Sequence, residues 1–257
     1  MKIIGVCLIT ILTILISGIG FIFYTEGADA FSFNTVKIQE NQQIQGDDIQ
    51  NIYISSGSTD VELVKHSGNE IDIELDGEVS EKMKDAFDLK VSETNRTLEV
   101  ELDRLMRPSF TVFAINKGTK LTIKIPSNMY QDIIVESSSG DIYVNGITSD
   151  KVDLQAKSGD ITIKNSFAQT AFLKANSGDI TGSDLLTVDA KTTSGDISLS
   201  TKENSFTLQF KSNSGEGEIN VPGFLFEKKE EDLIVGKLGD GEYSMSIRTN
   251  SGDFLLN

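Results

Sequence analysis

The sequence predicts an all-β protein, a single-stranded β-solenoid (β-helix) with coils of about 19 residues, preceded by one N-terminal transmembrane helix. Three observations predict this fold. A Ser-Gly-acid triplet recurs along the second half of the chain. Apolar and polar residues alternate on both sides of each triplet. A long apolar run without charge opens the chain.

The apolar run extends from residue 3 to residue 24. A helix of this length would be about 33 Å long, and the hydrocarbon core of a bilayer is about 30 Å thick. We therefore expect residues 1–24 to form a transmembrane anchor that contacts the membrane through residues 3–24. A cleaved signal peptide is the alternative, because Ala28-Asp29-Ala30 resembles a cleavage site. Signal-peptide apolar cores are usually shorter, about 7–15 residues, which favours the anchor.

The flanks of this run predict its orientation. Lys2 precedes it, and Glu26 and Asp29 follow it. Because positive flanks stay in the cytoplasm, we expect a single-pass protein of the cell membrane with a cytoplasmic N-terminus and an extracellular C-terminal domain. The polar residues 25–49 are expected to form a stalk or linker. Cys7 is the one cysteine and lies in the apolar run, so no disulfide is expected outside it.

The repeat is the main signal of the remaining sequence. Its triplets are Ser139-Gly140-Asp141, Ser158-Gly159-Asp160, Ser177-Gly178-Asp179, Ser194-Gly195-Asp196, Ser214-Gly215-Glu216 and Ser251-Gly252-Asp253. The glycines are 19, 19, 17, 20 and 37 residues apart, and the last spacing suggests a coil whose turn has lost its triplet. Gly140, Gly159, Gly178, Gly195, Gly215 and Gly252 are expected to supply the positive φ that a tight turn needs.

The residues before each triplet follow a fixed order in alternate positions, namely two large apolar residues, a small residue and the serine. Ile133, Val135, Ser137 and Ser139 are one example. A period of two predicts strands with one buried face, and stacking such coils would make a continuous core that narrows at the turn.

The domain boundaries follow from this pattern. Residues 50–257 are expected to form an extracytoplasmic β-solenoid, with irregular opening coils over 50–126 and the Ser-Gly-Asp repeat over 127–257. Residues 80–87 are expected to form a short helix capped by Ser80. The final apolar strand, at residues 254–256, has no coil after it, so we expect an exposed edge that allows self-association or pairing with a partner strand.

The net charge of −16, with 39 acidic and 23 basic residues, argues against nucleic acid as a partner. His66 is the one histidine and lies in a segment typical of a strand end, so neither a Ser–His–Asp triad nor a zinc site is expected. Acidic residues are spread one per turn, whereas glycan-cleaving enzymes need them paired. We expect no catalytic residue, no cofactor and no enzymatic activity.

A column of acids is the one alternative site. Asp141, Asp160, Asp179 and Asp196 would stack about 4.8 Å apart, and like charges at about 4 Å repel by about 1 kcal/mol in water. Calcium bound between turns would offset this repulsion. Backbone N–H groups of the turns or sodium from solution would serve equally well.

The apolar run, the segment 52–61 and the Ser-Gly-Asp turns resemble the bacterial "putative adhesin" β-strand-repeat family, a domain of unknown function, and in particular LiaG-like membrane proteins. The resemblance implies a cell-envelope protein of Gram-positive-type bacteria that is associated with envelope-stress loci. It brings no catalytic residues.

Two functions remain open from the sequence. The first is a non-enzymatic, membrane-anchored scaffold or sensor that is linked to the envelope-stress response and has an envelope or membrane protein as its partner. The second is an adhesin-like surface protein or glycan-binding module. Exposed aromatic residues favour glycan binding, and the repeat offers few, with Tyr143 and Phe172 facing outward by register.

Overall fold

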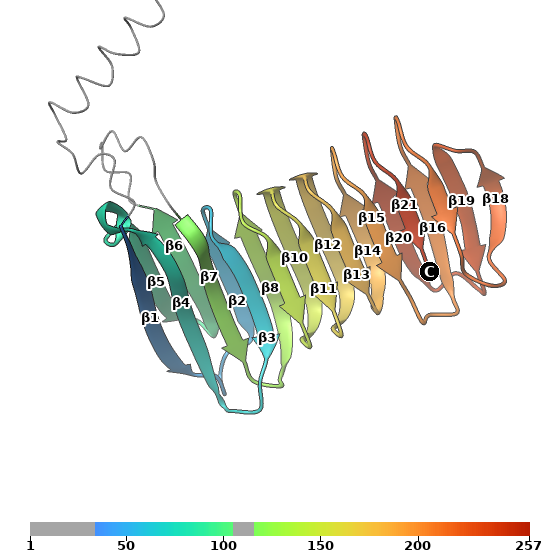
Figure 1. The fold of residues 1–257 in the computed structure, drawn as a ribbon. Coiled ribbons are helices and arrows are strands. Elements are labelled where there is room, and N and C mark those ends of the chain that lie inside the picture. Colours follow the sequence, from blue (N-terminus) through green and yellow to red (C-terminus); the bar gives the residue numbers. More distant parts are fainter. Residues whose placement is uncertain (1–33, 105–115) are drawn as a thin grey trace, which may run out of the picture.

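The computed structural model describes residues 34–104 and 116–257, which form two long β-sheets lying face to face (Figure 1). The predicted all-β fold is confirmed. Sheet A contains, in spatial order, β1 (Thr35–Gln45), β4 (Glu70–Ser80), β7 (Asn116–Ile125), β3 (Asp60–Lys65), β9 (Ile142–Asn145), β11 (Ile161–Lys164), β13 (Ile180–Ser183), β15 (Ile197–Ser200), β21 (Phe254–Leu256) and β17 (Gly217–Ile219).

Sheet B is made by the partner strands of the same coils. It contains, in spatial order, β18 (Leu225–Lys229), β19 (Leu233–Leu238), β16 (Phe206–Lys211), β20 (Tyr243–Arg248), β14 (Leu185–Lys191), β12 (Phe167–Ser177), β10 (Thr148–Ser158), β8 (Met129–Ser137), β2 (Asn51–Ser56), β6 (Thr97–Arg104) and β5 (Phe87–Thr94). Each coil of the repeat thus gives one strand to each sheet, which is the arrangement of a solenoid.

The coils stack in parallel and in register. Val152 of β10 pairs with Ile133 of β8 on one side and with Ala171 of β12 on the other. Alternate residues of these strands point between the sheets and are buried, as in β12, whose Ala171 and Leu173 are at most 1% exposed. The predicted strands with one buried face and the predicted continuous core are therefore confirmed.

Antiparallel strands close both ends of the stack. At one end β1 pairs with β4, β4 with β7, and β5 with β6. At the other end β19 pairs with β16, and β18 with β19. The expectation of a stalk over residues 25–49 is wrong for residues 35–45, because these residues form β1 of sheet A. Their polar side chains suit an edge strand with little burial.

The coils do not stack in the order in which they occur along the chain. The coil of β20 and β21 lies between the coil of β14 and β15 and the coil of β16 and β17. The 37-residue spacing therefore does not mark a lost turn. It contains the hairpin of β18 and β19 and the return of the chain to an interior position (Figure 1).

This order overturns the expectation of an exposed edge at residues 254–256. Strand β21 pairs with β15 on one side and with β17 on the other, and Phe254 is 1% exposed. The backbone groups of β21 are consumed by these neighbours, so the strand offers no free edge for self-association.

Two further expectations concern helices. Residues 81–83 form a 3-10 helix, η2 (Glu81–Met83), in place of the expected helix over residues 80–87, and Ser80 makes no side-chain capping bond to it. Between residues 34 and 104 and from 116 onward, the protein has no helix with the length and apolarity that crossing a bilayer requires. The anchor expected at residues 3–24 lies outside the described residues.

Candidate binding face and acid ladder

The acids of the repeat turns form a hydrogen-bonded ladder along one side of the solenoid. In each step, a carboxylate Oδ1 accepts the backbone N–H of the acid in the next coil, at 2.8–2.9 Å. The ladder runs in spatial order through Asp60, Asp141, Asp160, Asp179, Asp196, Asp253 and Glu216. Asp60 belongs to the diverged coil of β2 and β3, so the ladder extends beyond the recognisable triplets.

The ladder explains how stacked acids coexist. Each N–H donor places a partial positive charge against the neighbouring carboxylate, and hydrogen bonds to ionised acceptors are stronger than neutral ones. Of the three alternatives left open by the sequence, the structure shows backbone N–H groups against the carboxylates of Asp141, Asp160, Asp179 and Asp196. In the part of the chain that the structure describes, no three His, Cys, Asp or Glu side chains cluster as metal ligands would.

The glycine of each turn is needed for close stacking. A Cβ on Gly178 would lie 2.1 Å from the carbonyl oxygen of Gly159, and the other five triplet glycines would meet a neighbouring carbonyl oxygen at 2.0–2.4 Å. Of the six, Gly195 and Gly252 have positive φ, at 153° and 154°. The expectation that all six supply positive φ is wrong, because the requirement is space between coils.

Left-handed backbone occurs at the opposite turn of the coil. Gly146, Asn165 and Asp184 follow the second strand of three successive coils and have φ of 76°, 49° and 60°. Asn and Asp tolerate this region better than other side chains do, and glycine adopts it freely. These left-handed residues lie outside the Ser-Gly-acid triplets and were not predicted from the sequence.

The outer face of sheet B carries the candidate binding site. Outward side chains of neighbouring strands stand side by side in rows, because the strands are parallel and in register. One row changes charge along its length, and we call it the charged row. It consists of Glu101, Ser55, Glu136, Gln155, Lys174, Lys191, Arg248 and Lys211.

The four cations of the charged row come from four neighbouring strands. Lys174 of β12 pairs with Lys191 of β14, Lys191 pairs with Arg248 of β20, and Arg248 pairs with Lys211 of β16. All four side chains are exposed. The sequence did not predict this cluster, since each cation stands alone in its own coil and Arg248 joins it through the inverted coil order.

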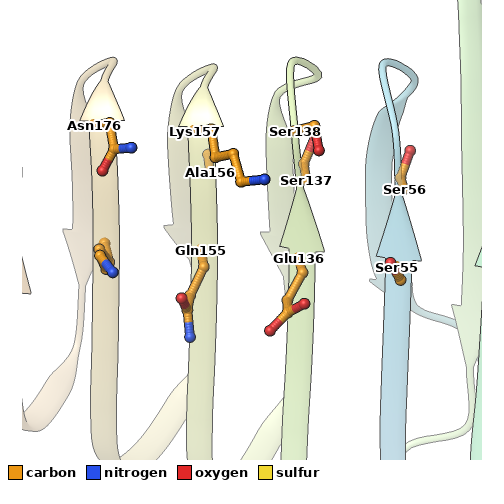
Figure 2. A pocket seen from close by; sticks show the side chains of 10 residues that line it. Ser55, Ser56, Glu136, Ser137, Ser138, Gln155, Ala156, Lys157 and Asn176 are labelled. Carbon is orange, nitrogen blue, oxygen red and sulfur yellow. The ribbon is translucent and has the colours of Figure 1, made fainter.

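An open pocket of about 450 Å³ lies where the row changes sign, and it crosses β2, β8, β10 and β12 (Figure 2). Glu136, Gln155 and Lys157 point into it from neighbouring strands. Beside it, the Tyr53 hydroxyl donates a hydrogen bond to Glu136 at 3.3 Å. Burial and the nearby Glu136 carboxylate raise the pKa of Tyr53.

A second open pocket, of about 240 Å³, lies further along the same face. Phe172 is 38% exposed there, and the Lys151 ammonium group lies 5.4 Å from its ring centroid. The guanidinium of Arg248 donates to both carboxylate oxygens of Asp189, at 2.6 and 3.0 Å. Phe172 thus faces outward on sheet B as predicted, and Tyr143 lies half-buried on the outer face of sheet A.

His66 has both ring nitrogens engaged. Nδ1 accepts the Gly68 N–H at 3.2 Å, so Nε2 carries the proton and donates to the Glu70 carbonyl oxygen at 2.6 Å. These bonds close a turn between β3 and β4, which is a structural role.

Parallel coils, an acid ladder and capped ends define an all-β, solenoid-like repeat protein. The chain belongs to the Toastrack DUF4097 family, whose model matches residues 49–187 and 183–257. No curated protein matches the sequence.

Several solved structures resemble the fold at low sequence identity. A "putative cell adhesion protein" from Clostridium sporogenes is 12% identical with a TM-score of 0.52, and the match covers 86% of this chain and 99% of that one. A "putative adhesin" from Bacteroides fragilis is 15% identical with a TM-score of 0.43, covering 88% and 98%. A "putative lipid binding protein" from Parabacteroides distasonis is 15% identical with a TM-score of 0.35, covering 86% and 97%. At 12% identity, the match to the Clostridium sporogenes protein shows that the two proteins share a fold.

Proposed function

We propose that this chain is a non-enzymatic protein of the cell envelope that acts as a scaffold or sensor, as expected for a LiaG-like member of its family. In this proposal residues 3–24 hold it in the membrane with the solenoid outside, and it takes part in the response to envelope stress. Its partner is an envelope or membrane protein.

The observation that carries the proposal is the outer face of sheet B. It is long, regular and exposed, and its two pockets are open grooves with mixed polar and charged linings. Such a face suits recognition of an extended partner, whereas catalysis usually needs an enclosed pocket with convergent groups. The ladder carboxylates already accept N–H groups, so they are engaged in holding the coils together.

Site-specific crosslinking in native membranes tests the proposal. A photo-crosslinking residue is placed at Gln155 on sheet B, and a matched one at Lys164 on the outer face of sheet A. We expect one defined envelope or membrane protein to be captured from Gln155, confirmed by reciprocal capture, and not from Lys164. Equal capture from both positions, or recovery of wall polymer without any protein, would contradict the scaffold proposal.

The membrane anchor has its own test. Deleting residues 3–24 is expected to move the protein from the membrane fraction to the soluble fraction, because the apolar run is the proposed anchor. A protein that stays with the membrane after this deletion would contradict the proposed anchor.

An adhesin-like or glycan-binding function is the second candidate. Phe172 favours it, because an exposed aromatic ring beside Asp153 and Gln155 can stack on a sugar while the polar groups bind its hydroxyls. Phe172→Ala should then abolish binding to purified cell-wall glycan, while Phe167→Ala, an equally exposed phenylalanine of the same strand, should not. Equal binding by both variants would exclude this pocket as the glycan site.

A further inference from the structure

Three of the four cations of the charged row have no ion-pair partner in the described residues. Arg248 is paired with Asp189, but Lys174, Lys191 and Lys211 form no ion pair with any residue in the two described stretches. Like charges on directly opposed strand positions destabilise a sheet. A protein of net charge −16 thus keeps four cations in line on neighbouring strands, and three of them, all lysines, have no ion-pair partner there.

We propose that Lys174, Lys191, Arg248 and Lys211 bind a linear polymer of phosphate groups that lies across the strands of sheet B. The inference rests on the proposed function, because it assigns a ligand to the same face. The four cations extend over three strand spacings of about 4.8 Å each, so one chain of phosphates can contact all of them.

The shape of the cluster favours a linear ligand over a flat membrane surface. The cations form a single line, and the neighbouring row toward the middle of the strands contains Asp153, Phe172 and Asp189. An anionic bilayer pressed against this face would meet those carboxylates as well. A polymer confined to the line would avoid them.

The chemistry of the row favours phosphate over carboxylate. The Arg248 guanidinium is already engaged by a carboxylate, since its Nη2 donates to both oxygens of Asp189. The three lysines are compact point charges that suit phosphate oxygens. On the turn side of the row, Asn176, Thr193 and Asn250 are exposed and can donate hydrogen bonds to further phosphate oxygens.

The test uses the full-length chain and inorganic polyphosphate as the probe. Binding is measured from 50 to 200 mM salt for the unmodified protein, for K174Q/K191Q/K211Q, and for the control K37Q/K65Q/K164Q. Lys37, Lys65 and Lys164 are exposed lysines of sheet A, so both variants change the net charge from −16 to −19. Circular dichroism and melting of all three proteins establish that the fold is kept.

Release of counterions sets the expected result. With four cations engaged, affinity should fall about 50-fold across this salt range, and with Arg248 alone about 3-fold. We expect the unmodified protein and the control K37Q/K65Q/K164Q to show the roughly 50-fold fall in affinity with salt. The variant K174Q/K191Q/K211Q should bind weakly and show the roughly 3-fold fall. Equal loss in both variants would overturn the site.

Other probes separate the ligand classes. Polyglutamate that binds as tightly as polyphosphate would overturn phosphate as the ligand and indicate an acidic polypeptide. Anionic phospholipid vesicles that bind while polyphosphate does not would overturn a linear ligand, and monophosphate that competes equally per phosphate would overturn a polymer. If polyphosphate fails to bind while crosslinking at Gln155 still captures its protein, the ligand assignment falls and the scaffold proposal stands.

Discussion

Single residues of the Ser-Gly-acid turn are set by contacts between neighbouring coils. The glycine gives room to the carbonyl oxygen of the glycine below it, and the acid receives the N–H of the acid above it. Both kinds of contact recur at the six steps from the coil of β2 and β3 to the coil of β16 and β17, so the glycine and the acid set the spacing of these coils.

Gly178→Ala tests the stacking role of the glycine. The added Cβ would lie 2.1 Å from the Gly159 carbonyl oxygen, so the coils must separate locally, and we expect a loss of about 1–3 kcal/mol in the free energy of unfolding. Gly57→Ala is the control, because a Cβ there meets no atom within 4 Å. Urea titration measures both, and equal stability of the two variants would contradict the close contact.

The buried phenol of Tyr130 is expected to make the free energy of unfolding fall in alkaline solution. Its side chain is 1% exposed, and burial raises the pKa of its phenol far above the usual value of 10.0. The folded protein therefore holds this proton more tightly than the unfolded chain does. The stabilising effect is complete below about pH 10 and is lost as the pH rises above it.

Tyr130→Phe is expected to flatten this dependence. The variant loses the hydroxyl bond to the Pro126 carbonyl oxygen, which costs about 1 kcal/mol at neutral pH. Above pH 10 the unmodified protein should lose stability faster than the variant, as measured by urea titration at several pH values. Parallel curves for the two proteins would assign the alkaline loss to other groups.

The sequence predicted that the acids of the turns form a column, but it did not predict which groups their carboxylates contact. Asp141, Asp160, Asp179 and Asp196 were recognised as a column because their spacing repeats. Whether a cation or an N–H group offsets their charge depends on the path of the backbone between coils, which spacing alone does not specify. The charged row was missed for a related reason, since its members become neighbours only through strand register.

At the scale of elements, the acid ladder links six pairs of coils through the same kind of bond, and it places an N–H group against each accepting carboxylate. Each step uses one carboxylate oxygen and one N–H group. The strands and their register followed from the alternating pattern. The capping strands β1, β5, β18 and β19 did not, because they pair antiparallel and lie outside the Ser-Gly-acid repeat.

Substitution at Asp179 distinguishes the ladder from a calcium site. Asp179→Asn keeps an oxygen acceptor for the Asp196 N–H and removes one negative charge, so we expect stability to be kept or slightly raised. Asp179→Ala removes the acceptor and should cost about 1 kcal/mol. Adding calcium at constant ionic strength should leave the melting temperature of the unmodified protein unchanged. A calcium-specific rise that Asp179→Asn abolishes would restore the calcium alternative.

At the scale of the whole molecule, the order of the coils differs from the order of the sequence. The surface of β14 that binds β20 is built from the same alternating residues as every other strand, so a sequence pattern cannot tell which later coil will dock there. The pattern thus predicted a solenoid and its core, while the position of β20 and β21 emerged from the structure.

Phe254→Ala measures how deeply this coil is inserted. The ring stacks on Phe210 with centroids 5.3 Å apart and is 1% exposed, so its removal should cost about 3–5 kcal/mol. Leu255→Ala is the matched control on the outer face of the same strand, and it should cost less than about 1 kcal/mol. Similar small losses for both variants in urea titration would place β21 at a free edge.

The inserted coil also constrains how the protein is made. Residues 206–219 are synthesised before residues 243–257, yet they can only dock through them. During translation the coils from β8 to β15 can assemble in order, because each contacts its neighbour in sequence and can fold as it emerges. The coil of β16 and β17 can dock only after residues 243–257 have been synthesised, so a chain released before that point exposes the apolar end of a half-built stack.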